Sequence, residues 1–451
     1  MSSTVVPTET PPPAAPRLLR ALRHRNFRLY FVGQGLSLIG TWLTKMAMTW
    51  LVYQLAQEHG VLKAATTLGV VTFVSNVPMF LLAPFSGVFV DRFNRHRVIV
   101  FTQVMAMLQS AALAVLTLGH WITIPQVIGL ALFQGLIDSL DAPARQSFII
   151  EMVDDPVDLA NAIALQSSIF NGARLLGPAM GGLLLLLKFS PGWCFTIDAA
   201  SYIAVIAGLL MMRLKPRPPR VHNTDVFADL VAGARYTFGF PPLRAILMLV
   251  AVVSFSASAM QPLLPILADG MAGGPRGAGN FGFLLTSIGV GALTGSIYLA
   301  SRRTVVGLAR VMCVAAMIIG GTMSCIVLTN NFYIALLLGA ASGFGTVTHF
   351  ASGNTMLQTI TEDAMRGRVM SFFAMLVVGT APFGALLAGW MSDRIGASLV
   401  VHIYASLALI ATLLFLRKLT ELRALVRPIY VKKGIIPEVA MALGMDAQDE
   451  R

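Results

Sequence analysis

Apolar residues fall in long runs that alternate with short polar stretches along almost the whole chain. A helix needs about 20 apolar residues to cross a bilayer, so each run predicts one transmembrane helix. The longest polar break, 213–243, separates the sixth run from the seventh and includes a predicted helical stretch from Asp225 to Phe238. The twelve expected spans are 27–55, 64–90, 98–119, 123–147, 160–187, 193–212, 244–268, 281–300, 305–328, 332–355, 368–390 and 397–416.

The composition agrees with lipid as the solvent of these helices. Hydrophobic residues make up 56% of the chain and charged residues 12%, against about 25% charged in soluble domains. The three cysteines all lie in apolar runs, which argues against a disulfide framework or a metal site. No Lys directly follows a Gly, so a Walker A loop is excluded. We therefore expect no metal and no cofactor, and an ion gradient as the source of energy.

The positions of the positive charges predict an orientation. With the N-terminus in the cytoplasm, most of the 33 Lys and Arg residues fall on cytoplasmic segments. Four fall outside (Lys63, Lys188, Arg276 and Arg394), and two fall inside spans (Lys45 and Arg174). This is the positive-inside pattern, and it places both termini in the cytoplasm. It also explains the net charge of +12 without nucleic acid.

The two halves of the chain repeat each other at a spacing of 208 residues. This spacing relates Gly87 to Gly295 and Gly181 to Gly389, and it relates the loops after the fourth and tenth spans. The fold class is therefore an all-α membrane protein with twelve transmembrane helices in two pseudo-symmetric six-helix bundles. The expected parts are a disordered or amphipathic tail (1–24), an N-terminal bundle (25–212), a cytoplasmic linker (213–243), a C-terminal bundle (244–416) and a cytoplasmic tail (417–451).

Three motifs carry a family resemblance. The loop after the second span reads Gly87-Val-Phe-Val-Asp91-Arg92-Phe-Asn-Arg95, which resembles the G-xxx-D-R-x-G-R-R signature of the major facilitator superfamily. The fifth span contains a Gly-Pro-rich stretch like that of the antiporters in that superfamily, with Gly172, Gly177, Pro178, Gly181 and Gly182. Thr41-Trp42, the stretch from Asp141 to Phe148 and Asn161-Ala-Ile-Ala-Leu165 are similar to the branch of enterobactin exporters and macrolide efflux proteins.

The resemblance implies alternating access, in which one half rocks against the other around a site at the bilayer midplane. It assigns Gly87, Asp91, Arg92 and Arg95 to a conformational switch, with Asp91 at the N-terminus of the eleventh span. It assigns the corner at Gly177 and Pro178 to sealing of the outer side. It also implies a bacterial inner membrane as the location.

Ionisable residues at membrane depth are the candidates for function, because each costs about 2.5–3.5 kcal/mol to insert and usually faces a wet cavity or a partner. Lys45 is expected near the inner part of the first span, and Asp138 in the inner half of the fourth. An alternative for Asp141 is a structural ion pair with Arg145, and for a lone histidine a place in the core. The candidates for proton coupling are Asp138, Asp141 and His349, and those for the substrate cavity are Trp42, Lys45, Asp138 and Arg174.

Together these features predict a proton-coupled exporter of amphipathic organic compounds, either drug-like molecules or siderophores. Its partners would be the small-molecule substrate, protons and membrane lipids, and it would act as a monomer. A lipid or lysolipid flippase on the same fold is an alternative. An alternative of another class, a membrane-embedded sensor or enzyme, has no catalytic motif such as HExxH or GxSxG in its favour.

Overall fold

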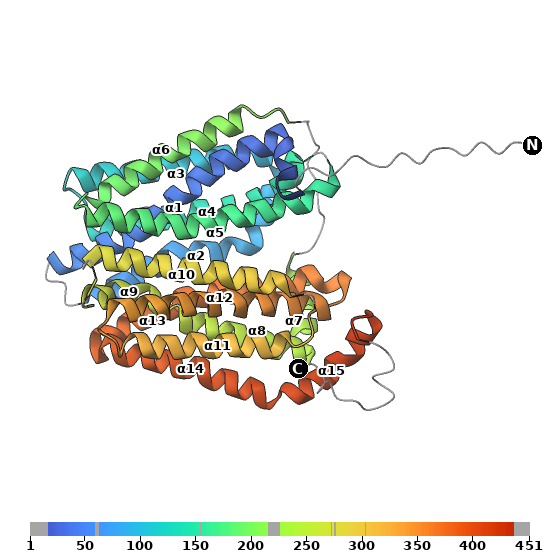
Figure 1. Cartoon of the computed structure of the whole chain (residues 1–451). Coiled ribbons are helices and arrows are strands. Elements are labelled where there is room, and N and C mark those ends of the chain that lie inside the picture. The colour runs from blue at the N-terminus through green and yellow to red at the C-terminus, as the bar shows by residue number, and fades with distance from the viewer. Residues whose placement is uncertain are drawn as a thin grey trace, which may run out of the picture.

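The protein is a bundle of long helices that run nearly parallel to one another (Figure 1). The computed structural model describes residues 17–58, 63–153, 155–214, 226–271, 273–274, 277–302 and 304–436. In Figure 1, helices α1 to α6 lie together in one half and α8 to α14 in the other. The helices are η1 (Arg17–Arg23), α1 (Arg25–Glu58), α2 (Ala64–Arg92), α3 (Arg95–Leu118), α4 (Ile124–Met152), α5 (Pro156–Leu186), α6 (Pro191–Leu210), α7 (Val226–Gly239), α8 (Pro241–Ala257), α9 (Met260–Asp269), α10 (Gly277–Ser301), α11 (Leu308–Ile326), α12 (Phe332–Ile360), α13 (Asp363–Ile395), α14 (Ala397–Arg417) and α15 (Leu419–Lys432).

The twelve expected spans are all present as helices. Among the described residues, 11 segments are long and apolar enough to cross a membrane, with α8 and α9 together forming one of them. The twelfth is α1, which is 34 residues long but less apolar. Its polar residues include Gln34 and Ser37, each only 1% exposed. The prediction of two six-helix bundles is therefore confirmed, and α1 spans as an interior helix whose polar side chains face other helices.

The seventh span differs from the expected continuous helix. It consists of α8 and α9, which are separated at Ser258 and Ala259. Pro262 lies in the first turn of α9 and has no N–H to donate to the carbonyl of Ser258, so an uninterrupted helix would lose this hydrogen bond. Proline is tolerated in the first turn of a helix, and α9 begins accordingly at Met260.

The two halves meet through two pairs of helices. Helix α5 packs on α10, and α2 packs on α13. Helices η1, α7 and α15 lie at one end of the bundle, which we call the tail end (Figure 1). The opposite end, where α1 ends and α2 begins, is the distal end. Among the described residues, α4 packs only on helices of its own half to any large extent, and so does α12.

The predicted cytoplasmic tail contains one further helix. Helix α15 begins directly after α14 and buries Leu422, Val426 and Tyr430. The Lys433 ammonium that follows it donates to the backbone carbonyls of Thr359, at 2.7 Å, and Thr361, at 3.2 Å. A cation at the C-terminal end of a helix is favoured by the helix dipole, so Lys433 holds α15 against the end of α12.

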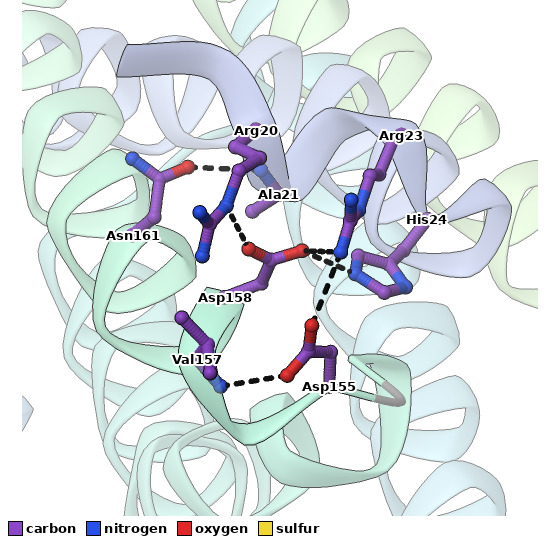
Figure 2. Close-up of polar contacts among 8 residues, drawn as sticks. All are labelled: Arg20, Ala21, Arg23, His24, Asp155, Val157, Asp158 and Asn161. Carbon is purple, nitrogen blue, oxygen red and sulfur yellow. Dashed lines mark hydrogen bonds and ion pairs between the residues drawn. The ribbon is translucent and has the colours of Figure 1, made fainter. Parts of the chain in front are cut away.

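At the tail end, the segment before α1 is fixed to the start of α5 by an acid with several basic partners (Figure 2). The side chain of Asp158 is completely buried and lies between Arg20, Arg23 and His24. Arg23 reaches it at 2.8 Å and His24 at 2.9 Å, while Arg20 contacts the other carboxylate oxygen. The segment η1 therefore cannot leave α5 without exposing a multiply paired charge.

The second half has a counterpart of this contact. Helix α7 precedes the first span of that half, as η1 does in the first, and it packs on α13. The backbone N–H of Glu362 donates to the hydroxyl of Tyr236 at 3.4 Å, and Gly233 lies against Arg368. In each half a short leading helix thus contacts the start of the fifth span of that half, α5 or α13.

The Asp158 contact predicts a specific loss of stability. Asp158→Asn removes the negative charge and leaves the basic partners together, so it should lower the melting temperature, though by less than the loss of a fully buried pair because both arginines reach solvent. Asp155→Asn is the matched control, since its side chain is 41% exposed and an Asn still caps α5; it should cost under about 1 kcal/mol.

Thermal unfolding of the purified protein, followed by the reaction of buried Cys194 with a thiol dye, measures both variants. Equal melting temperatures for the two variants would contradict this role of Asp158.

Candidate functional site: a cluster of charged and aromatic residues

Helices α1 and α5 bring two cations and two aromatic rings together near the middle of the first half. The Lys45 ammonium lies 5.5 Å from the centre of the Trp42 ring, and the Arg174 guanidinium carbon lies 5.6 Å from it. Phe170 meets the same ring edge-on, with the ring centres 5.8 Å apart. Both cations are within the range of a cation–π interaction. We call Trp42, Lys45, Phe170 and Arg174 the Trp42 cluster.

The spacing of these residues explains the arrangement. Trp42 and Lys45 are three residues apart on α1, and Phe170 and Arg174 are four apart on α5, so each pair lies on one helix face. Lys45 is exposed and Phe170 is 46% exposed. Lys45 lies past the middle of α1 toward the distal end, not near the inner part as expected. Trp42, Lys45 and Arg174 are predicted from the sequence as cavity residues; Phe170 is not, and its spacing of four residues from Arg174 is the signal that could have found it.

Asp138 lies on α4 next to this cluster. Its carboxylate accepts a hydrogen bond from Gln134 at 2.8 Å and interacts electrostatically with Lys45. The side chain is half-buried, near the midpoint of α4. The structure therefore brings together Trp42, Lys45 and Arg174, with Asp138 as the acid beside them. Gln134 is a further residue of this site that sequence reasoning did not assign.

The side chain of Asp141 points away from the Trp42 cluster. It is buried between α3 and α4, where it accepts hydrogen bonds from Thr102 at 2.7 Å and from Gln103 at 3.0 Å. Its other oxygen lies 2.5 Å from Nε of Arg145. Asp141 therefore has the structural role that the sequence offered as an alternative to proton coupling, an ion pair with Arg145. Asp141 thus holds the interior of the first half together, one turn closer to the tail end than Asp138.

His349 is likewise inside one half. Its side chain is completely buried between α12 and α11, and Nδ1 lies 3.0 Å from the backbone carbonyl of Met312. Because a carbonyl only accepts, Nδ1 carries the proton. Nε2 has no partner among the described residues. The structure does not bring His349, a candidate for proton coupling, to the Trp42 cluster.

One more acid occupies the interior of the first half. Asp198 on α6 is 1% exposed and accepts a hydrogen bond from Ser110 at 2.7 Å. Gly40 makes room for it, because a Cβ at that position would lie 2.5 Å from the Asp198 carboxylate. Asp198 therefore lies where α1, α3 and α6 meet.

The glycines of α5 divide between two neighbours. A Cβ on Gly177 would lie 2.5 Å from the Cβ of Trp42, and one on Gly181 would lie 2.9 Å from Met46, so both face α1. A Cβ on Gly182 would lie 2.9 Å from the Cα of Gly282 on α10, in the other half. Gly177 thus positions Trp42, whereas Gly182 forms the contact between the halves. Pro178 also faces α10, since a Cβ on Gly282 would lie 3.0 Å from its carbonyl oxygen, and the sealing of the outer side by Gly177 and Pro178 stays a prediction.

Comparisons with known proteins agree with this architecture. Residues 17–441 match the family described as transmembrane secretion effectors. The chain belongs to this family of the major facilitator superfamily. It is similar to the staphyloferrin A transporter of Staphylococcus aureus, with 25% identity over 82% of this chain and 90% of the relative. It is also similar to the multidrug efflux pump Tap of Mycolicibacterium fortuitum, with 26% identity over 86% and 95%.

Further likenesses support the branch and the fold. The enterobactin exporter EntS of Escherichia coli is 25% identical over 89% of this chain and 93% of its own length. This confirms the resemblance inferred from the sequence. Among solved structures, a POT family transporter bound to 5-aminolevulinic acid superposes with a TM-score of 0.69 at 12% identity, covering 88% of this chain and 96% of that one. The chain is therefore a multi-pass membrane transporter and not an enzyme.

In this major facilitator protein the two halves are joined at the distal end. The Tyr53 hydroxyl donates to Asp269 at 3.0 Å, and Trp50 stacks on Phe281 with the ring centres 6.2 Å apart. Asp393 accepts from the backbone N–H of Thr66 at 2.7 Å, at the N-terminal end of α2, where the helix dipole favours an anion. Every hydrogen bond between described residues of the two halves lies at this end.

The switch motif lies at the tail end, where α2 ends. Gly87, Asp91 and Arg92 belong to this helix, but their side chains are outside the part of the chain that the structure describes. The predicted contact of Asp91 with the start of α13 therefore stays a prediction. Arg95 is described, and its guanidinium lies 3.0 Å from Glu151 at the end of α4.

The contact between Gly182 and Gly282 predicts which glycine controls closure. Gly182→Leu should force α5 away from α10, because a large side chain does not fit where two backbones meet. In a background without native cysteines, a short bis-maleimide should then join cysteines at 57 and 270 about tenfold more slowly.

The matched control is Gly172→Leu on the same helix, since a Cβ there meets nothing within 4 Å. It should cross-link at the rate of the parent protein. A normal rate in Gly182→Leu would show that this contact does not hold the distal end together.

Proposed function

We propose that this protein is a proton-coupled exporter of amphipathic organic compounds, drug-like molecules or siderophores, that works by alternating access. The observation that carries the proposal is the Trp42 cluster with Asp138: charged groups at membrane depth on α1, α4 and α5, in a protein whose halves are joined at the distal end. Such groups in transporters mark substrate and proton pathways. Relatives named as an exporter and as an efflux pump support outward transport.

The proposal includes an orientation and a location. Most Lys and Arg residues outside the spans lie at the tail end, which the positive-inside rule places in the cytoplasm. The distal contacts then close the outer side, and the substrate site faces the cytoplasm. The relative from Escherichia coli supports a bacterial inner membrane. The two bundles, 25–212 and 244–416, are the units that rock, and one monomer suffices because both line the same path.

Asp138 is the proposed proton carrier. It combines a carboxylate, partial exposure and a nearby cation, whereas Asp141 is engaged by Arg145 and by two hydrogen-bond donors, and His349 lies inside the other half. One proton that crosses about 100 mV releases about 2.3 kcal/mol, and one pH unit adds about 1.4 kcal/mol. Together they support a substrate gradient of several hundred-fold, on the order of 500, for one proton per substrate.

The proton role of Asp138 is tested by separating coupling from substrate movement. Asp138→Asn should abolish proton-driven uptake into inverted vesicles, because an amide carries no titrating proton, but it should keep counterflow, because the Trp42 cluster remains. The substrate is first identified by growth protection across drugs, siderophores and lysolipids.

Asp138→Glu is the control, since it keeps a carboxyl group at the same place, and it should retain at least about a tenth of the driven transport. Full proton-driven transport by Asp138→Asn would remove Asp138 as the carrier. If the protein protected cells against a lysolipid but not against drugs or siderophores, the result would favour a flippase.

A further inference from the structure

We infer that the Trp42 cluster is a subsite for an acidic group of the substrate, with an aromatic or apolar body beside it. This rests on the proposed function for the identity of the site as a substrate site, but not on the direction of transport or its proton coupling. The geometry points to a carboxylate or a similar planar anion that bridges Lys45 and Arg174.

The charges of the cluster are the first argument. Two cations lie about equally far from the centre of one indole ring, at 5.5 and 5.6 Å. Neither forms an ion pair with any described residue. Two acids, Asp138 and the buried Asp198, interact electrostatically with Lys45. No described acid does so with Arg174, whose positive charge therefore stays uncompensated. A ring face attracts cations only weakly, and two like charges at membrane depth repel each other.

Several other buried or partly buried charges of the first half have a close partner of opposite sign. Arg145 is paired with Asp141 at 2.5 Å, and Asp158 is surrounded by basic partners. Arg95 is paired with Glu151 at 3.0 Å. These are pairs in which packing keeps the acid and the base together. Lys45 and Arg174 differ because an aromatic ring, not a carboxylate, is their common neighbour.

The shape of the cluster fits a planar acid. A guanidinium presents two parallel N–H groups to a carboxylate, and an ammonium adds a point charge, so the two cations together can bind both oxygens. Phe170 meets the edge of Trp42 and is 46% exposed, which gives the body of the ligand an apolar surface. A cationic compound would be repelled by the same two groups, so the cluster discriminates by charge.

The inference is tested with three probes of one shape and different charge: 1-naphthoate, 1-naphthamide and 1-naphthylmethylammonium. Binding to the purified full-length protein in detergent is measured by calorimetry, which needs neither a proton gradient nor a known substrate. The parent protein should bind the naphthoate at least about tenfold more tightly than the amide, and the ammonium more weakly than both, because hydrogen bonds to charged groups are the stronger ones.

Variants of the two cations then test whether the preference for naphthoate over naphthamide arises at the Trp42 cluster. Lys45→Gln and Arg174→Gln should each remove most of the preference for naphthoate over naphthamide, and Lys45→Arg should restore it. The matched control is Arg394→Gln, because the Arg394 guanidinium also lies over an indole ring, that of Trp390 at 3.8 Å, but at the exposed distal end. It should keep the full preference.

Equal binding of the acid and the amide by the parent protein, or an unchanged preference in both Gln variants, would overturn the subsite. Should either Gln variant fail to fold, the Lys45→Arg and Arg174→Lys pair replaces it, and a tenfold difference between those two would still support a planar acid, since only an arginine binds it bidentately. If the preference holds while vesicle uptake fails, the proposed direction or coupling is wrong and the subsite stands.

Discussion

Charge compensation inside a medium of low dielectric constant is the constraint on which the rest of this structure depends. In the first half, buried acids accept hydrogen bonds from a neighbouring helix. Asp141 on α4, which is paired with Arg145 of the same helix, accepts from Thr102 and Gln103 of α3, and Asp198 on α6 accepts from Ser110 of α3. These contacts fix α3, α4 and α6 relative to each other, because moving α3 away would leave buried carboxylate oxygens without their hydrogen-bond donors. Such internal bonding is what the proposed rocking mechanism requires of a half that moves as one body.

The contacts between the halves are of another kind. They consist of glycine against glycine, stacked rings and a few hydrogen bonds at the distal end, such as those of Tyr53 and Asp393. Contacts of this kind can be broken and remade without leaving an ion unpaired. This difference between the contacts within a half and those between the halves supports the proposed movement of one half against the other.

The sequence was enough for the architecture but not for the direction of individual side chains. Long apolar runs gave twelve spans, because a span is defined by length and hydropathy alone. Asp138 and Asp141 are three residues apart and share one broad helix face, yet Asp138 interacts with Lys45 of α1, and Asp141 accepts hydrogen bonds from Thr102 and Gln103 of α3. That choice is made by α1 and α3, which are distant in sequence. The same holds for His349, whose partner is a backbone carbonyl that no residue pattern reveals.

Residues and segments that the repeat relates also make corresponding contacts in the two halves. Asp141 and His349 are images of each other, and both contact the third helix of their own half, at Thr102 and at Met312. The segments η1 and α7 correspond as well, each against the fifth helix. The halves differ where function is proposed, because the Trp42 cluster lies in the first half alone. The chain thus keeps a symmetric scaffold and places its charged site on one side.

The proposed function requires that Lys45 and its neighbours face a space between the halves that opens toward the tail end and not toward lipid. A single cysteine at position 45, in a protein whose native cysteines are replaced by serine, tests this with a membrane-impermeant maleimide. The account predicts labelling at least about tenfold faster in inverted vesicles than in right-side-out vesicles. Labelling that is equally slow from both sides, or faster from the distal side, would contradict it.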